Sequence, residues 1–299
     1  MHLWGIDLGG TKIEGAVLES RENPKPIARQ RFPTEAAKGY AHILGQVGKM
    51  VEMLSAETGL KPGHLGIGHP GTIDPNTGVV KNANTTVLNG KPFDKDLMAR
   101  LGVRVRFAND ANCFAVAEAL MGAVPDALPD AEVVFGVILG TGVGGGLVVR
   151  QKVINGRQGI AGEWGHNFLD ESGGPCYCGK TGCVETVLSG PALEKYYAGL
   201  SGHWCRLPEI AHRAEAGSDL AATQTIDRLI HFFGKAIAVV INIVDPDVIV
   251  LGGGVGNIDR LYTDGKDEAA KHLFNTRVDT LFLKPKLGDS AGVFGAALL

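Results

Sequence analysis

The chain has 299 residues, enough for two domains or one large α/β unit, and 44% of them are hydrophobic and 20% charged, as is ordinary for a soluble globular enzyme. A formal net charge of −3 argues against a nucleic-acid partner, and no run of 18 apolar residues predicts a membrane span. The first residues indicate a strand and not a signal peptide, and the five cysteines fit thiols or metal ligands better than disulfides, so we expect a cytoplasmic protein.

The first half of the chain alternates strand patterns with helical ones. Residues 3–8 and 13–18 are apolar runs on either side of Gly9-Gly10-Thr11-Lys12, a pattern typical of a hairpin. Residues 40–54 carry apolar side chains at helical spacing. The remaining predicted elements are a strand within residues 65–71 that ends in a sharp turn, a strand at 103–107 and a helix at 113–120.

The second half opens much as the first does. The pattern breaks at residues 122–129, where we place a lobe boundary, and apolar runs at 133–139 and 143–149 then flank Gly140-Thr141-Gly142. This faint internal repeat favours two α/β lobes, residues 1–121 and 122–287, although two hairpins can be alike by chance. The remaining predicted elements are a long helix at 220–244 that ends at Asp245-Pro246, a buried strand at 248–251 and a helix of small residues at 293–299.

Three of the predicted strands end in glycine-rich turns, within residues 7–12, 139–146 and 251–256. Glycine lets backbone N–H groups approach a phosphate oxygen without a Cβ in the way, and a carboxylate at Asp7 can hold Mg²⁺. No turn matches the P-loop or the Rossmann fingerprint. Each turn alone fits an ordinary hairpin, and Lys12 could equally point to solvent, but the three together predict a nucleotide site.

Four residues have the spacing of metal ligands. His166 is followed by Cys176, Cys178 and Cys183 in the pattern H-x9-C-x-C-x4-C. One imidazole and three thiolates suit tetrahedral Zn²⁺, and four protein ligands leave no position for a reactive water, so the zinc would be structural. The alternative is a loop of reduced cysteines, which so dense a cluster among glycines disfavours.

Several carboxylates stand where phosphoryl transfer to a sugar would need them. A hydroxyl that attacks a phosphate has to lose its proton to a base, and Asp110 directly follows a predicted strand. Glu163 and Glu185 flank the cysteine segment. The alternative for Asp110 is the N-cap of a helix, and the residue pattern leaves these two roles equally open.

Taken in chain order, these motifs resemble the ROK family (repressors, open reading frames and sugar kinases) over essentially the whole chain. The segments that carry the resemblance are residues 7–12, 109–112, 139–146, 162–166, 176–185 and 245–254. The zinc segment with its preceding Glu163-Trp164-Gly165-His166 is highly specific, whereas the glycine turns are much less so.

The resemblance implies an α/β fold of the actin-like (ribonuclease H-like) kind, a duplicated two-lobe sugar kinase fold with an inter-lobe cleft. Residues 1–121 would form the N-terminal lobe, to which a helix at about 288–299 returns, and residues 122–287 the C-terminal lobe with the zinc-binding loop. The family also implies a homodimer.

The resemblance also assigns roles to individual residues. Asp110 would be the catalytic base, and the residues expected to bind the sugar are Asn109, Glu163, His166 and Glu185, to which we add Gly71 in its sharp turn. His166 would serve twice, with one ring nitrogen on the sugar and the other on zinc. The residues expected to bind ATP with its Mg²⁺ are Asp7, Gly9, Gly10, Thr11, Lys12, Gly140, Thr141, Gly142, Gly252, Gly253 and Gly254.

The expected reaction is ATP-dependent phosphorylation of a hexose at its 6-hydroxyl. Residues 80–84, 88–97 and 163–167 are most similar to bacterial fructokinases and manno(fructo)kinases, so we expect fructose first, then mannose or glucose, with an N-acetylhexosamine as the alternative. Two departures leave the choice open: the short stretch between His166 and Cys176, and His69, where an aliphatic residue is common.

A function of another class is a sugar-sensing regulatory protein without catalysis. Repressors of the family carry a DNA-binding domain ahead of the segment that here starts at Asp7, and the charge of the chain is not basic. We therefore expect an enzyme whose partners are a small hexose and ATP, without nucleic acid or membrane.

Overall fold

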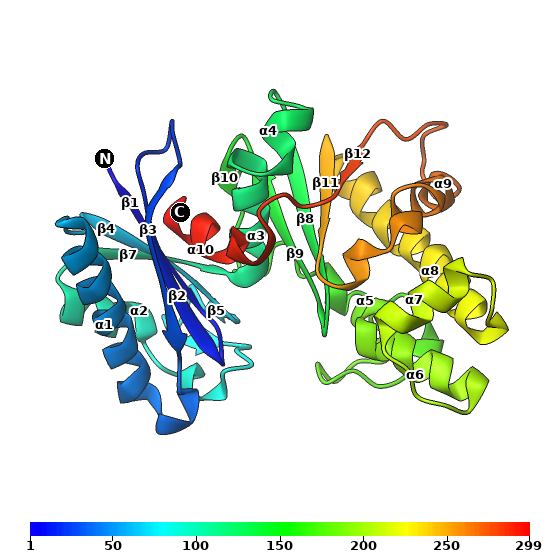
Figure 1. Ribbon diagram of the computed structural model, residues 1–299, viewed down its shortest axis with the longest axis horizontal. Helices are drawn as coiled ribbons and strands as arrows, with labels where there is room; N and C mark the ends of the chain where they lie inside the picture. The colour runs from blue at the N-terminus through cyan, green and yellow to red at the C-terminus, as the bar shows by residue number, and fades with distance from the viewer. The chain divides into compact units, whose positions relative to one another are not determined.

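The computed structural model describes residues 1–299, which form two compact units (Figure 1). Unit 1 comprises residues 1–126, 146–161 and 286–299, and unit 2 comprises residues 127–145 and 162–285. Two five-stranded sheets organise the chain, with the strand orders β3-β2-β1-β4-β7 and β10-β9-β8-β11-β12. The same order, hairpin strands first and parallel strands after them, occurs in both sheets, so the predicted internal repeat is confirmed.

The sheet of unit 1 is built around a buried central strand. Its strands are β1 (Leu3–Leu8), β2 (Lys12–Leu18), β3 (Pro26–Pro33), β4 (His64–His69) and β7 (Arg104–Asn109). β1 pairs with β2 in antiparallel and with β4 in parallel fashion, and β4 pairs in parallel with β7. A short ribbon of β5 (Thr72–Ile73) and β6 (Val80–Lys81) follows β4.

Helices cover both faces of this sheet. They are α1 (Tyr40–Thr58), α2 (Phe93–Leu101), α3 (Asp110–Leu120), α4 (Ala123–Ala127) and α10 (Ala291–Ala297). Figure 1 shows α1 and α10 on opposite sides of the sheet. Because side chains alternate along a strand, Trp4, Ile6 and Leu8 join the core under α1 and α2, whereas their neighbours face α10.

A buried carboxylate ties the returning C-terminal segment to α3. Glu118 is fully buried and accepts hydrogen bonds from the backbone N–H groups of Ala123, Lys286 and Leu287, at 2.8 to 3.1 Å. Three charge-assisted bonds offset the cost of burying the charge. They also fix the chain where it enters the segment that leads to α10.

Unit 2 contains the parallel part of the second sheet and a long helix. Its strands are β8 (Val133–Leu139), β11 (Val248–Gly252), β12 (Leu281–Leu283) and the first part of β9 (Val143–Val149), which continues into unit 1, where it pairs with β10 (Lys152–Val153). β11 pairs in parallel with both β8 and β12. The helices are α5 (Val184–Leu188), α6 (Gly190–Ser201), α7 (Leu207–Glu215), α8 (Leu220–Val244) and α9 (Asp264–Ala270).

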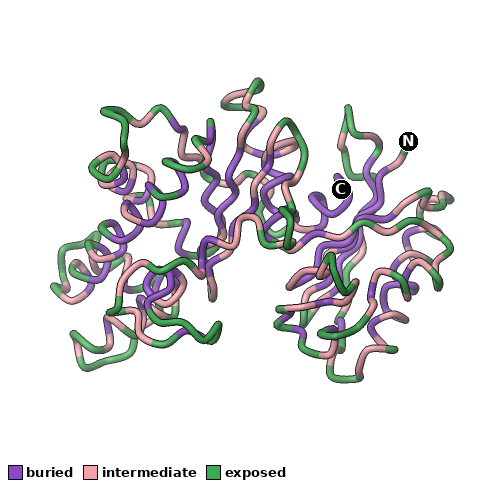
Figure 2. Tube along the Cα trace, turned by 180° about the vertical axis from the view of Figure 1, so that it is seen from behind, coloured by how far each residue is buried: buried purple, intermediate pink, exposed green.

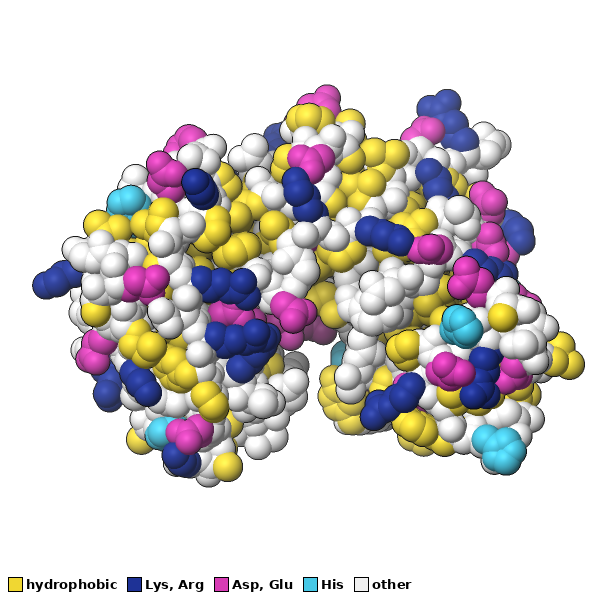
Figure 3. All heavy atoms as spheres, in the orientation of Figure 1, with side chains coloured by type: hydrophobic (Ala, Val, Ile, Leu, Met, Phe, Trp, Pro, Cys, Tyr) yellow, Lys and Arg dark blue, Asp and Glu magenta, His cyan; other side chains and the backbone are white.

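The central strands, such as β1 and β11, are buried, whereas the edge strand β3 and most connections are largely exposed, as Figure 2 shows for each unit. The face in Figure 3 carries acidic and basic side chains interspersed, without a continuous basic area. No helix has both the length and the apolar character that a membrane span requires, because the apolar α8 is also broken by charged residues.

Candidate functional site

The predicted catalytic base lies at the start of α3 in unit 1. Asn109 ends β7 and is the N-cap of α3, because its side-chain oxygen accepts from the N–H of Asn112 at 2.7 Å. The capping role that the pattern left open for Asp110 thus belongs to Asn109. The carboxylate of Asp110 accepts from the N–H of Ala111 at 2.9 Å and keeps a solvent-accessible side. The protein packed around its other sides raises the pKa of this carboxyl, which the backbone hydrogen bonds partly lower.

A second carboxylate of unit 1 is held close to the first. Burial, with the charges of Asp110 and Glu14 as smaller contributions, raises the pKa of Asp7 to about 6. Asp7 is near the end of β1 and its side chain lies against Gly292 and Gly68, on the α10 side of the sheet. A cation bound at Asp7 would therefore relieve a repulsion that is already present.

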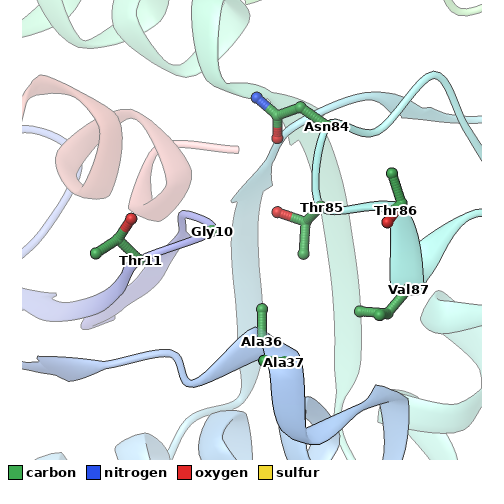
Figure 4. A pocket seen from close by; sticks show the side chains of 8 residues that line it. All are labelled: Gly10, Thr11, Ala36, Ala37, Asn84, Thr85, Thr86 and Val87. Carbon is green, nitrogen blue, oxygen red and sulfur yellow. The ribbon is translucent and has the colours of Figure 1, made fainter.

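The glycine turn after β1 borders a polar cavity of about 460 Å³ in unit 1 (Figure 4). Its lining residues are Gly10, Thr11, Ala36, Ala37, Asn84, Thr85, Thr86 and Val87. The hydroxyl of Thr85 is buried without a hydrogen-bond partner and points toward the Gly10 turn. An unpartnered buried hydroxyl beside three other polar side chains can donate a hydrogen bond to a ligand oxygen. The Lys12 ammonium lies 3.9 Å from Glu14, so it contacts a buried carboxylate and does not simply point to solvent.

Gly71 forms the sharp turn that follows β4. Its φ of 85° belongs to the left-handed region, and a Cβ at this position would lie 2.5 Å from the carbonyl oxygen of Lys81. Only glycine fits here, so the structure gives Gly71 a backbone role independent of any ligand.

The corresponding turn in unit 2 is held by Glu185. The carboxylate of Glu185, in α5, accepts from the N–H of Val143 at 2.9 Å, and a Cβ on Gly142 would lie 2.6 Å from the same oxygen. Gly140 is bonded to the N–H of Gly190 at 2.8 Å. The structure thus connects a residue predicted to bind sugar with the turn predicted to bind phosphate. Two further predicted residues, Gly252 and Gly253, come at the end of β11 in the same unit.

The four predicted metal ligands converge in unit 2. The ligand atoms of His166, Cys176, Cys178 and Cys183 all lie within 4.8 Å of one another. The Nδ1 of His166 is 3.6 Å from the sulfur of Cys176, and the sulfurs of Cys178 and Cys183 are 3.6 Å apart. Tetrahedral zinc, with bonds of about 2.0 Å to nitrogen and 2.3 Å to sulfur, would separate such ligands by roughly 3.5 to 3.8 Å. The donor set and its spacing therefore fit zinc.

Both ring nitrogens of His166 have defined surroundings. Nδ1 is on the thiol side, and Nε2 lies 3.0 Å from the hydroxyl of Tyr177, whose side chain is 83% exposed. Tyr177 thus holds the nitrogen that was expected to contact the sugar. Trp164 anchors the same segment, because its indole N–H donates to the carbonyl of Gly144 at 3.0 Å.

The predicted residues are divided between the units. Unit 1 holds Asp7, Gly9, Gly10, Thr11, Lys12, Gly71, Asn109 and Asp110, and unit 2 holds Gly140, Thr141, Gly142, Glu163, His166, Cys176, Cys178, Cys183, Glu185, Gly252, Gly253 and Gly254. Sequence reasoning missed Thr85 and Tyr177. Neither carries a signal in the sequence, since threonine in a polar loop and tyrosine in a glycine-rich one are common.

The fold and these residues define the class of protein. Two sheets of equal strand order, each opening with a hairpin, are the duplicated two-lobe actin-like fold, as predicted. The sequence matches the ROK family over residues 3–299, and the chain belongs to this family.

Individual relatives span nearly the whole chain. The chain is 36% identical to the N-acetyl-D-glucosamine kinase of Aliivibrio salmonicida (strain LFI1238) over 307 residues, which cover 99% of this chain and 98% of the relative. The ROK hexokinase from Thermus thermophilus is similar with a TM-score of 0.87 and 30% identity, over 100% of this chain and 97% of that one. A ROK family glucokinase from Streptomyces griseus, solved with glucose and AMPPNP, has a TM-score of 0.75 and 27% identity, over 99% and 98% of the two chains.

These similarities confirm the predicted family and leave the fructokinase prediction unconfirmed. The relative from Aliivibrio is named an N-acetyl-D-glucosamine kinase, which agrees with the alternative expectation of an N-acetylhexosamine kinase.

Proposed function

We propose that the protein is an ATP-dependent N-acetylhexosamine kinase that phosphorylates the 6-hydroxyl of N-acetyl-D-glucosamine. The observation that carries the proposal is the 36% identity, over 99% of the chain, with a kinase named for this sugar. The Thermus and Streptomyces proteins are named as kinases of hexoses, which agrees with the same reaction class. We place the N-acetylated sugar ahead of fructose for this reason.

Asp110 is proposed as the general base. Its carboxylate is fixed at the N-terminus of α3 by the N–H of Ala111, and burial raises its pKa, which makes the ionised carboxylate a better proton acceptor than an ordinary aspartate. The 6-hydroxyl would pass its proton to Asp110 as the hydroxyl oxygen attacks the γ-phosphorus and the bond to the β–γ bridging oxygen breaks, with ADP as leaving group. Asn109, whose side-chain oxygen caps α3, would hold the sugar beside the base.

Backbone groups are proposed to hold the nucleotide. Gly10 and Thr11 in unit 1 and Thr141 and Gly142 in unit 2 would offer N–H donors for phosphate oxygens. The N–H groups of Gly9 and Gly140 close the two turns instead, because they donate to the carbonyl oxygens of Lys12 and Gly142 at 2.9 Å. Gly252 to Gly254 would lie on the adenosine side. Asp7 is the residue that would hold Mg²⁺, directly or through water, and the cation would neutralise charge on the phosphates.

A structural zinc is proposed at His166, Cys176, Cys178 and Cys183. The spacing of the four donor atoms supports it, and the four ligands leave no open coordination position. The zinc would fix the loop that precedes α5 and hence the carboxylate of Glu185, and would take no part in the chemistry. Glu163 and Glu185 are proposed to bind hydroxyl groups of the sugar. His166 would do the same with Nε2 once a sugar hydroxyl replaces the exposed Tyr177 hydroxyl there.

The proposal is tested by a coupled assay of ADP release with Mg-ATP. The panel contains N-acetylglucosamine, N-acetylmannosamine, glucose, mannose and fructose. We expect the highest kcat/KM with N-acetylglucosamine. Preferred turnover of a sugar without the acetamido group would show that the proposed substrate is wrong and that the proposed reaction is right. Sugar binding without any ADP release would refute the enzyme and support a sugar-sensing protein.

A further inference from the structure

One histidine of unit 1 has no role in the proposed chemistry and yet carries an unusual feature. His69 ends β4 and its side chain is fully buried. Its Nδ1 lies 2.8 Å from the carbonyl oxygen of Pro70, and because a carbonyl can only accept, Nδ1 carries the hydrogen. The other nitrogen, Nε2, is therefore an acceptor, and it has no hydrogen-bond partner in the protein.

The surroundings of the ring keep it neutral. Phe93 and Phe107 contact it edge-on, with ring centroids 6.1 and 5.5 Å away. Burial lowers the pKa of His69 to about 4, so the imidazole is uncharged at neutral pH. A buried acceptor without a donor costs about 1–3 kcal/mol, and an apolar side chain at this position would avoid that cost.

His69 is among the residues that line a cavity, and a ligand bound there could supply the missing hydrogen-bond donor. The cavity has a volume of about 280 Å³ and lies within unit 1, and its lining residues are His69, Thr72, Ile73, Pro75, Phe107, Ala108, Asn155, Gly156 and Gly159. This volume exceeds the roughly 30 Å³ that one water occupies, so part of a ligand fits. Apart from the neutral His69, no side chain of the lining is acidic or basic, which argues against a phosphate or carboxylate as the natural occupant.

The cavity is next to the residues proposed to hold the sugar. His69 is the parallel-sheet partner of Asn109, and partners in register project to the same face of a sheet. Gly71, which we added to the predicted sugar site for its sharp turn, is two residues further along the chain. A sugar held at Asn109 would therefore lie on the same face of the sheet as the side chain of His69.

The lining combines the features that an acetamido group requires. Ile73, Pro75 and Phe107 offer apolar surface for a methyl group, Thr72 and Asn155 can donate to a carbonyl, and His69 Nε2 can accept from an amide N–H. We propose that this cavity is the subsite for the acetamido group of an N-acetylhexosamine and that His69 Nε2 accepts the hydrogen bond of its N–H. The assignment rests on the proposed function and adds the residue that selects the substrate.

The first test compares two variants by calorimetry in the absence of nucleotide. His69→Leu removes the acceptor and keeps an apolar side chain in the core, and His64→Leu makes the same change at the other end of β4. We expect His69→Leu to weaken binding of N-acetylglucosamine about three- to tenfold, to leave glucose binding unchanged, and to raise KM without lowering kcat. The His64→Leu variant should behave as wild type. An equal loss with both sugars, or none, would overturn the assignment.

The second test needs no variant. The side-chain nitrogen resonances of His69 are followed by NMR in nucleotide-free wild-type protein. The Nε2 signal should shift on addition of N-acetylglucosamine and stay unchanged with glucose; a signal that responds to neither sugar, although N-acetylglucosamine binds, would contradict the proposal. Because neither readout requires ATP turnover, a protein that binds the sugar and never phosphorylates it would refute the proposed function and still support the subsite.

Discussion

Asp7 and Asp110 are two carboxylates of unit 1 that influence each other: burial and then the charge of Asp110 raise the pKa of Asp7 to about 6. They come from the end of β1 and the start of α3, which the parallel strands β4 and β7 bring to one edge of the sheet. Two nearby carboxylates have a use in phosphoryl transfer, since one can hold a cation while the other accepts a proton.

The role of Asp110 predicts a loss of turnover on substitution. Asp110→Asn should lower kcat by about 10²–10⁴-fold, because general-base catalysis contributes that much, and should leave the Kd for the sugar within a few-fold of wild type. Steady-state kinetics and calorimetry measure the two effects. The exposed Asp130→Asn serves as the control and should be fully active. Near-normal turnover in Asp110→Asn would refute the role.

The raised pKa of Asp7 predicts that replacing this carboxylate by a neutral side chain stabilises the fold, and that the gain depends on pH. The folded-state value of about 6 lies above the ordinary 3.8, so ionised Asp7 destabilises the fold, fully above about pH 6 and progressively less as the pH falls toward 3.8. Asp7→Asn should therefore raise the Tm at pH 8 and have a smaller effect at pH 5. Thermal unfolding without added Mg²⁺ tests this, and a shift independent of pH would contradict it. The same variant should bind Mg-ATP more weakly.

Removal of one thiolate should release the zinc. Protein purified without added metal should contain about one zinc per chain, and Cys183→Ser should contain far less, with a lower Tm and reduced sugar binding, because Cys183 directly precedes α5, which carries Glu185. Cys205→Ser, outside the cluster, is the matched control. Wild-type protein that is active and free of zinc would overturn the metal site.

A methyl group at Gly142 should disturb the unit 2 turn. In Gly142→Ala the added carbon would lie 2.6 Å from the Glu185 carboxylate and displace it from the N–H of Val143. We expect kcat/KM to fall at least tenfold, which corresponds to about 1.4 kcal/mol of transition-state stabilisation. Gly199→Ala, where a Cβ meets nothing within 4 Å, should keep wild-type kinetics. Equal activity of the two variants would show that the contact is unimportant.

Glu118 should matter for stability. Glu118→Ala leaves the N–H groups of Ala123, Lys286 and Leu287 without their acceptor, so the free energy of unfolding should fall by about 3 kcal/mol. Glu118→Gln keeps one side-chain carbonyl oxygen as an acceptor, so its free energy of unfolding should fall less than that of Glu118→Ala. Chemical denaturation compares the two. If both variants unfold as wild type does, the three hydrogen bonds contribute little.

Local patterns determined much of the fold. The runs at 3–8, 133–139 and 143–149 agree with β1, β8 and β9 residue for residue, and the helix at 220–244 agrees with α8, because apolar runs, helical periodicity and Asp245-Pro246 are local signals. The helix expected at 113–120 starts at Asp110 instead, since the cap is the side chain of Asn109. Helix α1 continues to Thr58, where Gly59 ends it with a left-handed backbone.

The sequence by itself determined the family and the repeated hairpin, and it predicted which four residues converge at the proposed metal site, because chain order and short spacings carry that information. Only the tertiary structure decided that Nδ1 of His166 lies on the thiol side and that Tyr177 contacts Nε2. It also decided that Glu185 accepts a hydrogen bond from the turn at Val143. The burial of His69, with an unpartnered nitrogen beside a neutral cavity, is likewise a tertiary feature. These relationships join residues from different elements. Their geometry follows from how strands and helices pack, which no local pattern specifies.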